Sequence, residues 1–159
     1  DPFEFEYWAL DLVNAMPSQS KTKENMHGAD EGIDGIIIFF AGSKNGKSEH
    51  GRILVQVKGG GVQRNDIATL KGDIEREKAD GGLFITLEKP TRPMIQEAVS
   101  VGNFSVGYSK SEFPKIQILT IEELLNGRLP NLPPSSGVYY KEAKPIEIDN
   151  SKNQHKLFN

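Results

Sequence analysis

Gly32-Ile33-Asp34-Gly35 and Val55-Gln56-Val57-Lys58-Gly59-Gly60 are the two stretches of this 159-residue sequence that decide how its fold is read. In each stretch apolar residues lie beside polar ones. The segment between the two stretches has the length of one hairpin, so we expect two neighbouring strands. Successive side chains of a strand alternate between its faces, which puts Gln56 and Lys58 on the same face. The pattern therefore predicts an acid, an amide and an amine at the ends of two adjacent strands.

The segments around these stretches predict further helices and strands. Asp1 and Pro2 suit the start of an opening helix, in which an apolar stripe faces a sheet. The stripe consists of Phe5, Trp8, Ala9, Leu12 and Val13. After it we expect a central strand at 33–40, a protruding polar loop at 41–51, a strand at 52–58, a helix at 66–79, a strand at 83–87, a helix at 93–99, a strand at 115–119 and a helix at 120–125.

This order implies an α/β fold: a restriction-endonuclease-like mixed sheet with helices on both faces and an αβββαβ core, rather than a doubly wound nucleotide-binding fold. We expect one domain at 1–129 and an extended, Pro-rich and polar tail at 130–159. In the helix at 66–79 the spacing puts Ile67, Leu70 and Ile74 inside and leaves Asp73 exposed. Thr120 and Glu123 have the spacing of a capping box.

Composition excludes several classes of site. The chain has no cysteine, and its three histidines are scattered, so a zinc cluster is not expected and any metal is held by oxygen. No apolar run approaches the length of a membrane span, which favours a soluble, intracellular protein. The net charge of −3 neither supports nor excludes DNA binding. Because the chain begins without methionine, we expect a fragment of a longer protein.

The polar residues of the two strands suit the hydrolysis of a phosphodiester, which needs a positioned water and neutralisation of charge on phosphorus. Asp34 is the natural first ligand of a hard cation, with the side-chain oxygen of Gln56 and the carbonyl of Val57 beside it. Lys58 is placed to orient or deprotonate the water, or to stabilise the developing charge. Glu6 is a further candidate from the opening helix, and Asp30 is a weaker one.

Each residue also has a structural interpretation. An aspartate beside a glycine often only makes a turn, and it is the Gln-Val-Lys strand that favours the ligand interpretation of Asp34. Lys58 alone would be read as a solvated strand end. Glu6 lies in the first turns of a helix, where a glutamate commonly just complements the helix dipole.

The same residues carry a resemblance to a known family. Phe5-Glu6, the run from Gly28 to Gly35 and Gln56-Val57-Lys58-Gly59-Gly60 resemble the Mrr-like branch of the PD-(D/E)xK restriction endonuclease superfamily. Downstream segments such as Gly82-Leu83-Phe84-Ile85-Thr86-Leu87 resemble nuclease-like domains fused behind site-specific DNA methyltransferases, and the resemblance runs to about residue 133. It assigns catalytic roles to Asp34, Gln56, Lys58 and Glu6. Gln56 departs from the acid of the general pattern and is typical of the Mrr-like branch.

The resemblance implies a DNA endonuclease that uses Mg²⁺, or Mn²⁺ in its place, in a restriction-modification protein of the bacterial cytoplasm, associated with the nucleoid. Its implied partners are double-stranded DNA, a methyltransferase region upstream in the same chain, and a second copy as a homodimer. Candidate DNA contacts are Lys44, Lys47, Arg64 and Lys71. Two alternatives stay open: a non-cleaving DNA-binding or interaction module attached to a methyltransferase, and a scaffolding domain with no nucleic-acid role.

Overall fold

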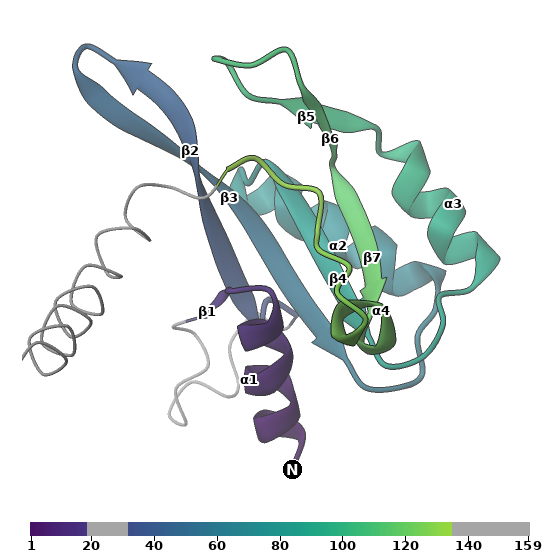
Figure 1. The fold of residues 1–159 in the computed structure, drawn as a ribbon. Coiled ribbons are helices and arrows are strands. Elements are labelled where there is room, and N and C mark those ends of the chain that lie inside the picture. Colours follow the sequence, from purple (N-terminus) through teal and green to yellow (C-terminus); the bar gives the residue numbers. More distant parts are fainter. Residues whose placement is uncertain (19–31, 135–159) are drawn as a thin grey trace, which may run out of the picture.

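The computed structural model describes residues 1–18 and 32–134, and Figure 1 shows their arrangement. Each helix and strand expected from the sequence is present, with its ends shifted by a few residues. The elements are α1 (Pro2–Leu12), β1 (Met16–Pro17), β2 (Gly35–Lys44), β3 (Lys47–Lys58), α2 (Arg64–Glu77), β4 (Gly81–Thr86), α3 (Arg92–Ser100), β5 (Asn103–Ser105), β6 (Glu112–Pro114), β7 (Ile116–Thr120) and α4 (Ile121–Leu125).

The main sheet has five strands in the order β1-β2-β3-β4-β7, and β5 pairs with β6 in a separate small ribbon. The pairs β1–β2 and β2–β3 are antiparallel, whereas β3–β4 and β4–β7 are parallel. The expected mixed sheet flanked by helices is therefore confirmed. The short strands β1, β5 and β6 were not expected, because two or three residues carry too little periodicity to be read.

The segment around 33–40 forms β2, which lies inside the sheet between β1 and β3, but the expected burial on both of its faces is wrong. β2 starts at Gly35 and is followed on its outer side only by the two-residue β1, so much of it lies near the sheet edge. Ile38 is accordingly 37% exposed. The strand buried along its whole length is β4, which has β3 on one side and β7 on the other. The continuous apolar run therefore predicted a strand correctly but overestimated how deeply that strand is buried.

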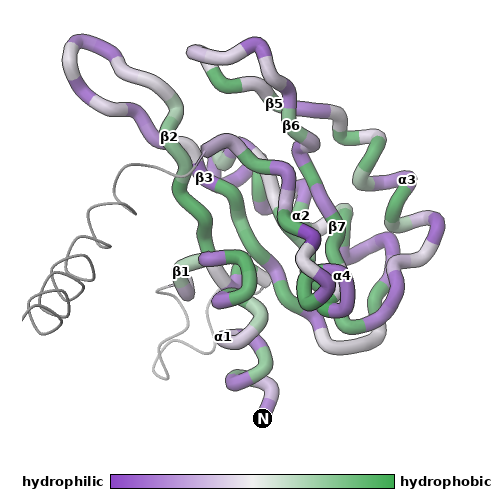
Figure 2. The backbone as a smooth tube through the Cα atoms, viewed as in Figure 1, coloured by the Kyte–Doolittle hydropathy of each residue, from purple (hydrophilic) through white to green (hydrophobic). Residues whose placement is uncertain are grey.

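The predicted loop at 41–51 is also wrong, because β2 and β3 continue through it as a hairpin. Their pairing runs out to Lys44 and Lys47, leaving Asn45 and Gly46 as a two-residue turn. These two residues have φ angles of 53° and 77°, the left-handed conformation that a tight hairpin turn requires. Figure 2 shows this arm as mostly hydrophilic at its tip and hydrophobic where it joins the sheet.

Two hydrophobic cores cover the two faces of the sheet. On one face α1 and α4 pack over Val55, Val57 and their neighbours, and on the other face α2 and α3 pack over Leu54 and Phe84. Alternation along β3 explains the division, since Val55 and Val57 point one way and Leu54 points the other. Gln56 and Lys58 share the α2 face with Leu54.

Helix α1 begins as expected, because the Asp1 carboxylate accepts the Phe3 N–H at 3.0 Å and Pro2 occupies the first helical turn. The predicted stripe is partly wrong. Leu10 is 2% exposed and packs in the core, whereas Trp8 is 43% exposed. The helix is turned so that Ala9 is buried and Leu10 faces Gly35, where an added Cβ would lie 2.6 Å from Leu10. No helix in the described parts of the chain is long and apolar enough to cross a membrane.

The segment after α4 is docked on the sheet. Gln117 of β7 accepts the Asn131 N–H and donates to the Asn131 carbonyl, both at 2.8 Å, and Leu132 packs against the α1-side core. Thr120 caps α4 by accepting the Glu123 N–H at 3.1 Å, while the Glu123 carboxylate pairs with Arg128 rather than returning to the cap. The rest of the predicted tail, from 135 onward, lies outside the described residues.

Gly51 of β3 packs against its cross-strand partner on β2. Gly51 pairs with Phe39, whose 2% exposed ring covers it, and a Cβ at position 51 would overlap that ring. We expect Gly51→Ala to lower the free energy of unfolding by about 1–3 kcal/mol, because the ring has no space into which to move.

Gly72→Ala is the matched control, since an added Cβ there meets nothing and the residue lies within α2. We expect this change to stabilise the protein by about 0.5–1 kcal/mol. Urea unfolding measures both variants, and equal stability of Gly51→Ala and wild type would contradict the packing described for Phe39.

Candidate catalytic site

Asp34 lies directly before β2, at the place where the pairing of β2 with β3 stops. Its backbone N–H donates to the Val55 carbonyl at 2.8 Å, and its side-chain Oδ2 accepts the Val57 N–H at 2.6 Å. The residue is 4% exposed. A buried carboxylate is costly unless hydrogen-bonded, so this short bond to a backbone N–H fixes the acid beside the end of β3.

The carbonyl of Val57 belongs to the same edge of β3 as its N–H. In a strand the N–H and C=O of one residue point towards the same neighbouring strand. Because Asp34 takes the Val57 N–H, the Val57 carbonyl also points to the Asp34 side, whereas its side chain packs in the α1-side core. A backbone oxygen and a carboxylate therefore lie along one edge.

Gln56 brings a third oxygen from the α2 side. Its Oε1 is buried, and none of the described residues donates a hydrogen bond to it. A methyl group added to Gly32 would lie 3.7 Å from Gln56 Nε2 and 3.5 Å from Asp73 Oδ2, which puts the amide beside Gly32 and near α2. A buried acceptor without a donor is uncommon in folded proteins, and a water, a ligand or an ion can satisfy it.

Asp73 was expected to be exposed on α2, and this is wrong: it is 5% exposed and faces the same region as Gln56. Its position is three residues after the buried Leu70, on the flank of the apolar stripe, which is the signal that was overlooked. Arg76, one turn later, pairs with Asp73 Oδ1 at 3.1 Å. The site thus has a second buried carboxylate nearby.

Lys58 is the last residue of β3, and its Nζ lies 2.8 Å from Oδ1 of Asp66 in the first turn of α2. The backbone is fixed at this point, since the Lys58 carbonyl accepts the Leu87 N–H at 3.2 Å. Asp66 was expected only as the start of a helix. A carboxylate eight residues after a candidate lysine, across three glycines, gives no periodic signal in the sequence.

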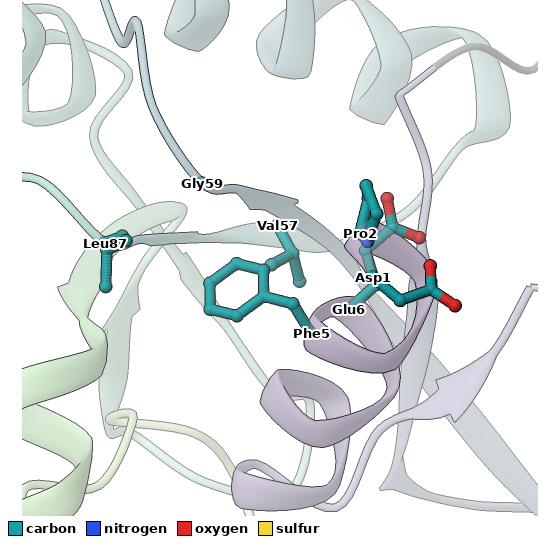
Figure 3. Close-up of a pocket in the computed structure, with 7 residues that line it drawn as sticks. All are labelled: Asp1, Pro2, Phe5, Glu6, Val57, Gly59 and Leu87. Carbon is teal, nitrogen blue, oxygen red and sulfur yellow. The ribbon is translucent and has the colours of Figure 1, made fainter.

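Glu6 approaches from the opposite face. It lines a cavity of about 430 Å³ between α1 and the ends of β3 and β4, together with Asp1, Pro2, Phe5, Val57, Gly59 and Leu87. Figure 3 shows Asp1 and Glu6 at one end of this cavity and Leu87 at the other. The cavity shares Val57 with the Asp34 side, and Glu6 lies on α1, which covers the face of the sheet opposite to α2.

The four candidate DNA contacts fall into two groups. Arg64 opens α2 near the end of the sheet that holds Lys58, and it pairs with Glu97 at 3.3 Å. Lys71 lies halfway along α2, next to Leu70, which packs near Gly82 at the start of β4. Lys44 and Lys47 flank the hairpin turn at the other end of β3. Since β3 has 12 residues at about 3.3 Å each, Lys47 is roughly 35 Å from Lys58. Asp30 lies outside the described residues.

The oxygens gathered near Asp34 fit a hard divalent cation. A carboxylate, a backbone carbonyl and a side-chain amide are ligands that such ions take, and the unsatisfied Gln56 Oε1 is the observation that favours one here. These three ligands together carry a single negative charge, that of the Asp34 carboxylate. No group of three or more His, Cys, Asp or Glu side chains suited to a metal occurs in residues 1–18 and 32–134.

A family model matches most of the described chain. Residues 1–126 match the Mrr_cat family, described as a restriction endonuclease. Neither the curated proteins nor the solved structures give a match to the chain. The matched range includes every element that positions Asp34, Gln56 and Lys58, and the five-stranded mixed sheet is consistent with a restriction-endonuclease-like fold. The chain belongs to the Mrr_cat family of restriction endonuclease domains.

Proposed function

We propose that this domain is a Mg²⁺-dependent DNA endonuclease that hydrolyses phosphodiester bonds, with its reaction centre at Asp34, Gln56, Val57 and Lys58. Membership of a restriction endonuclease family supports a nuclease acting on DNA. The observation that carries the proposal is the buried, unsatisfied Oε1 of Gln56 on the strand whose Val57 N–H holds the Asp34 carboxylate.

In the proposed reaction a water oxygen attacks phosphorus and the bond from phosphorus to one sugar oxygen breaks. The departing oxygen takes a proton, so the products are a phosphate monoester end and a hydroxyl end. Asp34, the Val57 carbonyl and Gln56 would hold Mg²⁺, or Mn²⁺ in its place, which supplies a Lewis acid for the phosphoryl oxygens. In this proposal the Lys58 ammonium donates hydrogen bonds to the charge that develops on the phosphoryl oxygens.

Glu6 has a secondary role in this proposal. Its carboxylate lines the α1-side cavity that Val57 closes, so it is placed to orient a water from that side. We also propose that the domain serves a restriction-modification protein of the bacterial cytoplasm, joined to a methyltransferase region and acting as a homodimer when both strands are cut. The likeness of its downstream segments to methyltransferase-fused domains supports that setting.

A second candidate function is a DNA-binding or interaction module, attached to a methyltransferase, that has lost cleavage. Gln56 favours it, since a neutral amide leaves Asp34 as the one carboxylate in the ligand set proposed above. Wild-type protein that binds duplex DNA with strong salt dependence, yet never cleaves it with Mg²⁺ or Mn²⁺ on methylated or unmethylated duplexes, would support this second candidate and overturn the first.

The first prediction that tests the proposed function concerns Asp34 and Lys58. Asp34→Asn and Lys58→Met should each lower the rate of plasmid nicking and linear cleavage by at least about 100-fold, because each removes a charge from the reaction centre. Supercoiled and linear duplexes incubated with Mg²⁺ or Mn²⁺ provide the measurement.

Asp80→Asn is the matched control. Asp80 accepts the Arg52 N–H of β3 at 2.9 Å, much as Asp34 accepts the Val57 N–H, but it does so in the middle of the strand, five residues before Val57. Asparagine retains an acceptor in both cases. Cleavage by Asp80→Asn should match wild type, and an active Asp34→Asn protein would overturn the assigned site.

The second prediction tests the sparse charge of the ligand set. Gln56→Glu adds a carboxylate near Asp34 and Asp73, so without metal the like charges should lower the melting temperature. Mg²⁺ should then raise the melting temperature of the variant more than that of wild type, since binding to the folded state stabilises it. Thermal unfolding across a Mg²⁺ titration measures this, with Gln63→Glu as the exposed control. An equal Mg²⁺ response in variant and wild type would contradict the cation site.

The third prediction separates the two groups of basic residues by duplex length. The roughly 35 Å between Lys47 and Lys58 corresponds to about ten base pairs, so only longer duplexes reach both ends of the sheet. Replacing Lys44 and Lys47 by serine should weaken binding to a 30-base-pair duplex and leave binding to an 8-base-pair duplex unchanged.

Replacing Arg64 and Lys71 by serine should weaken binding to both duplexes and reduce the salt dependence by about one unit of slope per residue. Fluorescence anisotropy at several salt concentrations measures both double variants. Loss of binding to the short duplex in the Lys44 and Lys47 variant would contradict the separation of the two groups.

A further inference from the structure

Asp66 of α2 holds two groups at once. Its Oδ1 lies 2.8 Å from Lys58 Nζ, and its Oδ2 accepts the Gln63 N–H at 2.8 Å. The second bond belongs to the capping box at the start of α2. One carboxylate thus ties the first turn of a helix to the ammonium at the end of the neighbouring strand.

The carboxylate itself has little freedom to move. Asp66 precedes the fully buried Ile67, and its side chain is 15% exposed. A negative charge in the first turn of a helix is also favoured by the helix dipole. Asp66 is therefore a fixed point against which a long, flexible lysine side chain can be held.

Lys58 needs such a fixed point. Its side chain has several rotatable bonds and ends a strand before three glycines, so its backbone alone does not locate the ammonium. An ammonium has three N–H donors, and the pair with Asp66 uses one of them. The Lys58 side chain is 34% exposed, and the two remaining N–H donors of its ammonium are available to a phosphate oxygen.

The ion pair between Arg64 and Glu97 lacks this construction. Arg64 pairs with Glu97 across 3.3 Å with the arginine side chain 61% exposed, an arrangement that contributes little in water. The pair of Asp66 with Lys58 is shorter and more shielded, and a backbone N–H anchors its acidic partner. This difference indicates a role beyond the stability of the fold.

We propose that Asp66 is a positioning residue for Lys58: it holds the ammonium in the orientation that the cleavage step requires. This inference rests on the proposed nuclease function for its kinetic part only. Asp66 does not touch the reacting atoms in the proposal and acts through Lys58 alone. Removing the negative charge of Asp66 should therefore slow DNA cleavage only as far as cleavage depends on Lys58.

Asp66→Asn is the informative variant, because its amide oxygen can still accept the Gln63 N–H while the charge facing Lys58 is lost. We expect kcat for DNA cleavage to fall about 10-fold with little change in KM, as expected when a group acting in the transition state is disturbed. Asp66→Glu, which keeps the charge, should recover part of the loss. In a Lys58→Met background Asp66→Asn should have no further effect.

Glu123→Gln is the matched control. It breaks the ion pair between Glu123 and Arg128, and Glu123 lies in α4 on the other face of the sheet. It should leave kcat unchanged. A full additional loss from Asp66→Asn in the Lys58→Met background would show that Asp66 acts independently of the lysine. A rise in kcat would show that Asp66 restrains Lys58. Either result overturns the inference.

A second measurement needs no cleavage. Limited acetylation with acetic anhydride, read by mass spectrometry, compares Lys58 with the exposed Lys71 in the same molecule. Asp66→Asn should raise labelling of Lys58 relative to Lys71 several-fold, and Glu123→Gln should not. Unchanged labelling overturns the inference whatever the activity. Raised labelling in a protein that never cleaves DNA leaves the pairing intact and rejects the proposed function instead.

Discussion

β3 is the constraint on which the rest of the structure depends. It pairs antiparallel with β2 on one edge and parallel with β4 on the other, so its backbone groups are taken on both sides. Its side chains must then alternate between two buried faces, each covered by a pair of helices. Val55 and Val57 fill the α1 face, and the polar Gln56 and Lys58 are forced to the α2 face. The position of the polar residues is thus a consequence of core packing.

The site lies where this ladder runs out. β2 starts at Gly35, so beyond Val55 there is no further strand carbonyl to accept the N–H of Val57, and the Asp34 side chain takes that place. The same bond that completes the sheet also fixes a carboxylate beside a backbone carbonyl and a buried amide. Structure and proposed chemistry therefore depend on one residue, which is why Asp34→Asn needs a control carboxylate that also accepts a backbone N–H of β3.

Much of the fold was readable from local patterns. Asp1 and Pro2 began α1, Thr120 capped α4, and alternation in β3 placed Gln56 and Lys58 on one face. The depth of burial within the sheet was not readable, because a long apolar run is compatible with several places in a sheet, and β2 proved to lie beside a two-residue strand. The tight turn at Asn45-Gly46 was hidden among other polar residues. Contacts between elements were the hardest to predict. Neither the ion pair of Asp66 with Lys58 nor the burial of Asp73 produces a periodic pattern in the sequence.

The candidate site shows the same limit. The sequence named Asp34, Gln56, Val57 and Lys58, whose relation follows from strand geometry. It gave no sign that Glu6 faces a cavity on the other side of the sheet, since that depends on how α1 is rotated. The rotation is set by Leu10 packing against Gly35, a contact between residues far apart in the chain.

The clasp between Gln117 and Asn131 has a consequence for where the folded unit stops. The Gln117 side-chain amide bonds both backbone groups of Asn131, and the next residue, Leu132, packs against the α1-side core. The family match ends at residue 126, before both of these contacts. The folded unit therefore extends a few residues beyond the family match, and those residues complete the core on the α1 side.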